Sequence, residues 1–160
     1  MKLASLLTSD QVILDLKAEV CEEAIAGILE HLMAKNLLLA EMHDEIFQAL
    51  KQREKQISTG IGYGVAIPHA FSESIDHVIT CFARSKEGVD FESIDHAPVN
   101  YIILFIVPKK DYNLHLQTLA AIAKMFNNCA VRQSFADAET IDEVLEIFAC
   151  CSSPTDAEKK

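Results

Sequence analysis

The sequence predicts a single α/β domain in which strands and amphipathic helices pack in layers. A continuous apolar run, Tyr101–Val107, ends at Pro108, which is typical of a central strand buried on both faces. Apolar residues recur at helical spacing in the segments before and after this run. At 160 residues, the chain has the length of one domain with its own core.

Three elements are predicted in the first third of the chain. Gln11–Leu16 alternates as an early strand does. Helices are predicted over Val20–Lys35 and over Leu39–Gln52. The apolar stripe of the first helix is formed by Cys21, Ile25, Ile28, Leu29 and Leu32, and that of the second by Met42, Ile46, Phe47 and Leu50.

The middle of the chain is predicted to be mainly strands. Val65–Ile67 forms a short buried strand, which Pro68 ends because proline has no N–H for a sheet ladder. A loop is expected over Phe71–Ser74, and β-branched and aromatic residues predict a strand over His77–Arg84. We expect a turn at Lys86–Gly88 and then the central strand at residues 100–107.

Two helices are predicted in the last third. Asp111 or Asn113 can cap the first, which runs to about Phe126. The second begins at Thr140, where the hydroxyl and the Glu143 side chain form a capping box. Residues 152–160 are polar and are expected to be a flexible tail, which leaves one domain over residues 1–151.

Composition narrows the class of partner. The net charge is −10 and the pI is near 4.9, which argues against nucleic acid or an anionic membrane as partner. An acidic surface suits a basic protein partner, or is simply a solvated face. The five cysteines lack metal-site spacing, so reduced thiols are expected. The N-terminal apolar run is too short for a signal peptide and no run could span a bilayer, so we expect a cytoplasmic protein without membrane insertion.

The stretch Thr59–Ala70 concentrates the residues suited to chemistry. Gly60, Gly62 and Gly64 alternate, and glycine lets another group approach the backbone closely. His69 follows Pro68 directly, where a histidine suits nucleophilic or acid–base work. On spacing alone the alternative stays open that the glycines form a tight twisted connection and that His69 is an ordinary polar group.

Two further residues are candidates for a functional role because they lie on the inward-facing sides of predicted helices. Arg53 lies on the apolar stripe of the second helix, where it either points toward the glycine-rich loop or extends its head into water. His115 lies in the first turn of its helix on the inward stripe, where N–H groups and the helix dipole attract phosphate. The alternative for His115 is a core histidine bonded to a carbonyl.

The segment Thr59–Ala70, with Arg53 and Glu54 upstream, resembles the active-site signature of enzyme IIA of the phosphotransferase system, fructose/mannitol/nitrogen type. The resemblance continues through Phe91–Val99 and from Val107 to Phe126, and includes His115-Leu116. It covers nearly the whole chain, excluding roughly the last ten residues. It implies a mixed β-sheet with helices on both faces.

The resemblance also implies the chemistry. His69 would be the phosphoryl acceptor, His115 a second active-site histidine and Arg53 an active-site arginine, with Thr59, Gly60, Gly62 and Gly64 in a loop that cradles phosphate. The donor would be an HPr-like phosphocarrier protein, and the acceptor an enzyme IIB or a regulated target protein. No cofactor and no metal are implied. The Phe91–Asp95 run and the N-terminal opening favour the nitrogen-type, regulatory branch.

Two other classes remain as alternatives. In one, the chain is a binding module whose His69 is never phosphorylated. In the other, His69, His77, His96 and His115 build a metal-dependent hydrolase, although these residues include no closely spaced ligand pair on one helix.

Overall fold

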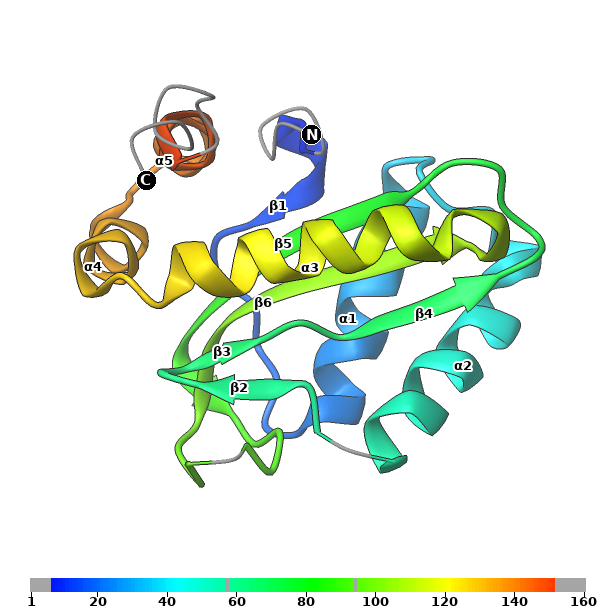
Figure 1. Cartoon of the computed structure of the whole chain (residues 1–160), viewed down its shortest axis with the longest axis horizontal. Helices are drawn as coiled ribbons and strands as arrows, with labels where there is room; N and C mark the ends of the chain where they lie inside the picture. The colour runs from blue at the N-terminus through cyan, green and yellow to red at the C-terminus, as the bar shows by residue number, and fades with distance from the viewer. Residues whose placement is uncertain (1–6, 57, 94, 152–160) are drawn as a thin grey trace.

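The computed structural model describes residues 7–56, 58–93 and 95–151. In this part of the chain a six-stranded sheet has the order β1-β5-β6-β3-β2, and β4 also pairs with β6 (Figure 1). The strands are β1 (Val12–Ile13), β2 (Gly60–Gly62), β3 (Val65–Ala66), β4 (His69–Ser72), β5 (Ile79–Val89) and β6 (Val99–Pro108). The pairs β1–β5, β3–β6 and β4–β6 are parallel, and β2–β3 and β5–β6 are antiparallel. The mixed sheet implied by the resemblance is confirmed.

Helices cover both faces of this sheet, as expected. The α-helices are α1 (Cys21–Ala34), α2 (His43–Gln56), α3 (Tyr112–Phe126), α4 (Cys129–Asp137) and α5 (Ile141–Cys151), with short 3₁₀ turns η2 (Ser9–Gln11), η3 (Ala40–Met42) and η4 (Lys109–Asp111). Figure 1 shows α3 crossing one face of the sheet while α1 and α2 lie behind the other. No helix among the described residues is long and apolar enough to cross a membrane.

The central strand β6 divides the core into two parts. Side chains alternate between the faces of a strand. Ile102, Leu104 and Ile106 belong to the cluster that also holds the buried stripes of α1 and α2. Tyr101, Ile103, Phe105 and Val107 belong to the second cluster, with α3, α4 and α5. The predicted burial of this strand on both faces is therefore confirmed.

The turn predicted at Lys86–Gly88 is wrong, because β5 continues through it to Val89. An irregularity in pairing between Arg84 and Val89 absorbs these residues as a bulge. Gly88 has φ +91 and donates its N–H to Ser85 Oγ at 3.1 Å. A Cβ at Gly88 would lie 2.7 Å from Cβ of Pro98, so this position requires glycine.

Several boundaries also differ from the predictions. Helix α2 begins at His43, after η3, and continues to Gln56 rather than ending at Gln52. Phe71 and Ser72, expected in a loop, belong to β4 because they pair with β6. The early strand is shorter than predicted, and only Val12–Ile13 pairs with β5. The expected tail, residues 152–160, lies outside the described residues.

The helix caps also differ in part from the predictions. Helix α4, which was not predicted, starts where the Asn128 side chain accepts the N–H of Ala130 at 2.9 Å. At α5, Thr140 Oγ1 accepts the Glu143 N–H at 3.2 Å, as predicted, but the Glu143 carboxylate returns to the N–H of Glu139. Asp111 precedes α3 without a capping bond from its side chain.

Arg84 is buried and joins three parts of the fold. Its Nε donates to the Leu14 carbonyl at 3.1 Å. Its Nη1 donates to the carbonyls of Phe135 and Ala138, at 2.9 and 2.5 Å. Those two carbonyls stand at the carboxyl end of α4, where backbone acceptors lack partners within the helix and positive charge is favoured. Arg84 therefore fixes α4 and the segment after β1 against β5.

Replacing this side chain should destabilise the fold. We expect Arg84→Met to lower the free energy of unfolding by about 3 kcal/mol, because it removes charge-assisted hydrogen bonds and leaves buried carbonyls unpaired. Urea denaturation measures the change. Lys86→Met, at an exposed position of the same strand, is the matched control and should change stability little. Equal effects of the two substitutions would contradict a structural role for Arg84.

Candidate phosphoryl-transfer site

His69 opens β4 at a break in the strand that lies along β6. Val65 and Ala66 of β3 pair with Tyr101 and Ile102, and pairing resumes at His69 opposite Phe105. Pro68 lies in the gap, but its carbonyl still accepts the Phe105 N–H at 2.9 Å. The break therefore changes the local geometry without detaching the chain from the sheet.

The face on which His69 lies follows from its neighbours in β4. Ala70 packs into the cluster of α1 and α2, whereas Phe71 packs against the cluster of α3, α4 and α5. Alternation places His69 on the side of Phe71, and their ring centroids are 6.5 Å apart at an interplanar angle of 81°. The His69 ring is thus on the sheet face that α3 covers.

The main chain selects one tautomer of His69. Its Nδ1 lies 2.8 Å from the Ile67 carbonyl oxygen, and a carbonyl only accepts, so we assign the proton to Nδ1. In the neutral ring the lone pair is then on Nε2. Burial lowers the pKa of the half-buried His69 ring, and the positive charge of Arg53 lowers it further, while the bond to Ile67 acts in the opposite direction. The geometry thus presents a neutral nucleophilic nitrogen.

The last turn of α2 contacts the residues before β2. Thr59 is buried and donates its N–H to Glu54 Oε2 at 3.1 Å, and its hydroxyl bonds to Glu54 Oε1. Burial raises the pKa of the Glu54 carboxyl, which these bonds and neighbouring Arg53 partly offset. Arg53 itself is half-buried and close enough to His69 to affect its pKa.

The glycines form a hairpin in which Gly60 pairs with Ala66. A Cβ on Gly60 would lie 2.9 Å from Cβ of buried Ser93, so β2 approaches Ser93 this closely only because residue 60 has no side chain. Gly62 and Gly64 have φ values of +96 and +77 and form the turn.

The two ends of this hairpin lie at different distances from His69. Val65 lies opposite Tyr101 and His69 opposite Phe105, so the turn end of β3 is about 13 Å from His69 along β6. Thr59, by contrast, accepts the N–H of Ile67, two residues before His69, at 3.1 Å. Of the predicted loop residues, Thr59 and Gly60 therefore lie at the end of the hairpin that is nearer to His69, and Gly62 and Gly64 lie at the far end.

Tyr63 occupies the turn with φ 59, and its ring is 63% exposed. The Arg132 guanidinium lies 4.5 Å from the ring centroid, and Tyr63 donates its N–H to Asp95 Oδ2 at 3.1 Å. The ring of Tyr63 therefore connects the turn to α4, and its main-chain N–H connects the turn to Asp95.

His115 is buried on α3, with 3% of its surface exposed. Its Nδ1 has no hydrogen-bond partner among the described residues, and a buried polar atom of this kind requires an explanation. Burial lowers the pKa of His115, opposed by the negative charge of Asp111. Because α3 packs over the face on which His69 lies, the fold brings both histidines to one side of the sheet.

The other histidines are held in separate places. His31 Nε2 lies 2.7 Å from the Asp10 carbonyl oxygen, His43 stacks on Phe47, and His77 pairs with Asp76 at 2.7 Å. His96, with φ 60, donates its N–H to the Ser93 carbonyl. Across residues 7–56, 58–93 and 95–151, no three His, Cys, Asp or Glu side chains are grouped as metal ligands.

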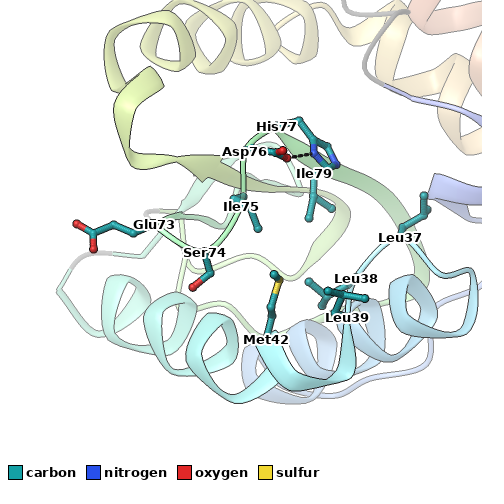
Figure 2. Close-up of a pocket in the computed structure, with 10 residues that line it drawn as sticks. All are labelled: Leu37, Leu38, Leu39, Met42, Glu73, Ser74, Ile75, Asp76, His77 and Ile79. Carbon is teal, nitrogen blue, oxygen red and sulfur yellow. Dashed lines mark hydrogen bonds and ion pairs between the residues drawn. The ribbon is translucent and has the colours of Figure 1, made fainter.

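A pocket of about 320 Å³ lies beyond the carboxyl end of β4, between the α1–α2 connection and the β4–β5 loop (Figure 2). Its lining includes Leu38, Met42 and Ile75, together with the Asp76–His77 pair. It contains none of the residues predicted for the site. The candidate site therefore lies apart from this pocket, around the half-buried start of β4.

Sequence reasoning assigned no role to Glu54, although it noted the residue beside Arg53. Its bonds to Thr59 connect positions five apart across the α2–β2 connection. The available signal was a carboxylate next to Arg53 and just before a threonine, but only the tertiary structure shows that it is half-buried and engaged.

Known proteins resemble this chain in sequence and in fold. Residues 5–150 match the family model described as phosphoenolpyruvate-dependent sugar phosphotransferase system, EIIA 2. A nitrogen regulatory protein of Bradyrhizobium diazoefficiens is 32% identical, with 92% of this chain and 96% of that protein covered. The fructose-specific EIIABC component of Bacillus subtilis is also 32% identical over 92% of this chain, which spans only 23% of that protein.

Solved structures show the same fold. The nitrogen regulatory protein IIA-Ntr of Neisseria meningitidis superposes with a TM-score of 0.83 at 29% identity, covering 91% of this chain and 97% of that one. The complex of enzyme IIAMTL and phosphorylated enzyme IIBMTL of Escherichia coli gives a TM-score of 0.73 at 25% identity, with 90% and 97% covered. By its sequence and its fold, this chain belongs to the EIIA type 2 family of the phosphoenolpyruvate-dependent sugar phosphotransferase system.

Proposed function

We propose that this chain is a phosphoryl carrier that accepts a phosphoryl group on Nε2 of His69 from an HPr-like protein. The observation that carries the proposal is the 2.8 Å bond from His69 Nδ1–H to the Ile67 carbonyl, which leaves the Nε2 lone pair for attack in a neutral ring. As the new N–P bond forms, the bond between phosphorus and the donor breaks. The donor group retains the electron pair of that bond.

The surroundings suit the charge that develops. In phosphoryl transfer the charge spreads over the equatorial oxygens, and catalysis consists mostly of positioning and electrostatics. Arg53 supplies a guanidinium on the α2 side, and buried His115, with Nδ1 unpaired among the described residues, supplies a polar group on the α3 side. Thr59 and Gly60 complete the wall of the site, whereas Gly62 and Gly64 shape the distant turn. No metal or cofactor takes part in this proposal.

The acceptor is proposed to be a regulated target protein. The nitrogen regulatory relative is covered over almost its whole length, and the solved structure of IIA-Ntr is similar with a TM-score of 0.83. The alternative is an enzyme IIB, which is present in the mannitol complex. Thiols of Cys21, Cys81, Cys129 and Cys150 are free, which fits the expected cytoplasmic setting.

Phosphorylation tests the carrier role. Incubation with phosphoenolpyruvate, enzyme I and an HPr-type protein should add one phosphoryl group, measured by intact mass. His69→Ala should abolish the addition while melting stays near that of the wild type, because the half-buried ring contributes one hydrogen bond. His77→Ala, at an exposed histidine outside the site, is the control and should be labelled fully. Full labelling of His69→Ala would reject His69 as the acceptor.

The pH dependence follows from the lowered pKa of His69. The ring should protonate only below the ordinary value of 6.5, so Nε2 stays nucleophilic down to that lower pH. Arg53→Gln should raise the titration midpoint of His69 only part of the way toward 6.5, because burial is the larger cause of the lowered pKa and remains in this variant. Exposed Lys55→Gln, in the same helix turn, should leave it unchanged. NMR titration of the ring measures the midpoints, and one above 6.5 in the wild type would contradict this account.

The acceptor proposal predicts state-dependent binding. A phosphoryl group adds roughly −1.5 to −2 charges, so a partner facing His69 should discriminate between the two states. Affinity capture with phosphorylated chain and with His69→Ala should recover different target proteins, and transfer to a IIB protein should be slow. Rapid, reversible transfer to IIB without a state-dependent target would assign the chain to sugar transport.

A further inference from the structure

A chain of hydrogen bonds runs from the end of α2 to the His69 ring. We propose that Glu54 is a positioning residue, which fixes the orientation and tautomer of His69 through Thr59 and the main chain of Ile67. The consequence for phosphoryl transfer rests on the function proposed above, but the effect on the ring does not.

The first link joins α2 to the segment before β2. Both carboxylate oxygens of Glu54 accept from Thr59, one from its N–H at 3.1 Å and the other from its hydroxyl. A carboxylate accepts from both groups with charged oxygens, whereas an amide accepts with one oxygen and can meet the hydroxyl only by donating to it, in weaker neutral hydrogen bonds. Thr59 is 5% exposed, so its two donors have little access to water as an alternative.

The second and third links pass through one residue. The Thr59 carbonyl accepts the Ile67 N–H at 3.1 Å, and the Ile67 carbonyl accepts from His69 Nδ1 at 2.8 Å. Ile67 is buried and is followed by Pro68, whose ring fixes φ. A shift of Thr59 would therefore move the Ile67 peptide and with it the acceptor that selects the Nδ1–H tautomer.

In its ionised state, Glu54 offers both oxygens as acceptors to Thr59. Burial raises the pKa of this carboxyl, while the two bonds from Thr59 favour its charged form. A protonated carboxyl would keep one oxygen as acceptor for the Thr59 N–H, but its O–H would donate to the Thr59 hydroxyl and so reverse that bond. The contact with Thr59 is thus strongest when Glu54 is charged, because hydrogen bonds to a carboxylate are stronger than those to a neutral group.

Glu45 supplies a matched control on the same helix. Its carboxylate accepts from the hydroxyls of Ser72 and Ser74 at 2.9 and 2.7 Å, at the far end of β4. It therefore joins α2 to the strand of His69 in the same chemical way, but outside the path through Thr59 and Ile67. Removing this contact should leave the His69 ring as it is.

The decisive measurement is the pair of ring ¹⁵N chemical shifts of His69 in the unphosphorylated protein near neutral pH. The wild type should show the Nδ1–H tautomer. Glu54→Gln should give a measurable share of the Nε2–H tautomer, and Thr59→Val, which lacks the hydroxyl, a smaller share. Thr59→Ser keeps a hydroxyl and should show the same ring shifts as the wild type. Glu45→Gln, made separately, should also show the wild-type shifts. Amide spectra check that each variant is folded.

The rate of phosphoryl uptake provides the functional readout. Glu54→Gln should slow uptake about 10-fold, the size usual for groups that orient a functional side chain through a second contact. Unchanged ring shifts in both Glu54→Gln and Thr59→Val would overturn the proposal. If Glu54→Gln fails to fold, the ring shifts of Thr59→Val are compared with those of Thr59→Ser, and equal shifts in these two variants overturn the proposal. Shifts that change as predicted in a protein that takes up no phosphate would reject the carrier function and leave the positioning role intact.

Discussion

The pairing of β6 with two successive strands on the same side is the constraint on which the rest of the structure depends. β3 and β4 lie along one edge of β6 and are separated only by Ile67 and Pro68. Since β6 is buried on both faces, it cannot move without disturbing both halves of the core. His69 is therefore placed at an irregular backbone position held by a central strand, which gives a half-buried reactive ring a defined location.

The two faces of the sheet contribute differently to the site. On one face, α2 reaches the edge of the sheet and delivers Arg53 and Glu54 near the start of β4. On the other face, α3 places His115 over the side toward which His69 alternates. The residues predicted for the site thus come from three separate segments of the fold, and they comprise one cation and two imidazoles, with the Glu54 carboxylate next to the cation. Burial lowers the pKa values of both imidazoles, which favours neutral, hydrogen-bonding rings.

Predictions from the residues succeeded where a single strong pattern was present. The apolar run of β6 and the stripes of α1 and α3 have the periodicity of buried elements, and the structure confirms them. The predictions were wrong where strand pairing with β6 decided the secondary structure. Lys86–Gly88 has the composition of a turn, yet it is absorbed into β5 as a bulge opposite β6. Phe71 and Ser72 became strand residues because β6 offers them partners, a fact that no local pattern contains.

The sequence by itself determined the layered α/β class, the strand-ending role of Pro68 and the prominence of His69 as a reactive side chain. These properties depend on near neighbours, through side-chain periodicity and the missing N–H of proline. Only the tertiary structure decided which glycines lie on the side of His69, which ring nitrogen bears the proton, and that Glu54 binds Thr59. Hydrogen bonds and burial depend on groups brought together by folding across a sheet edge, so their geometry has no counterpart in the linear order of residues.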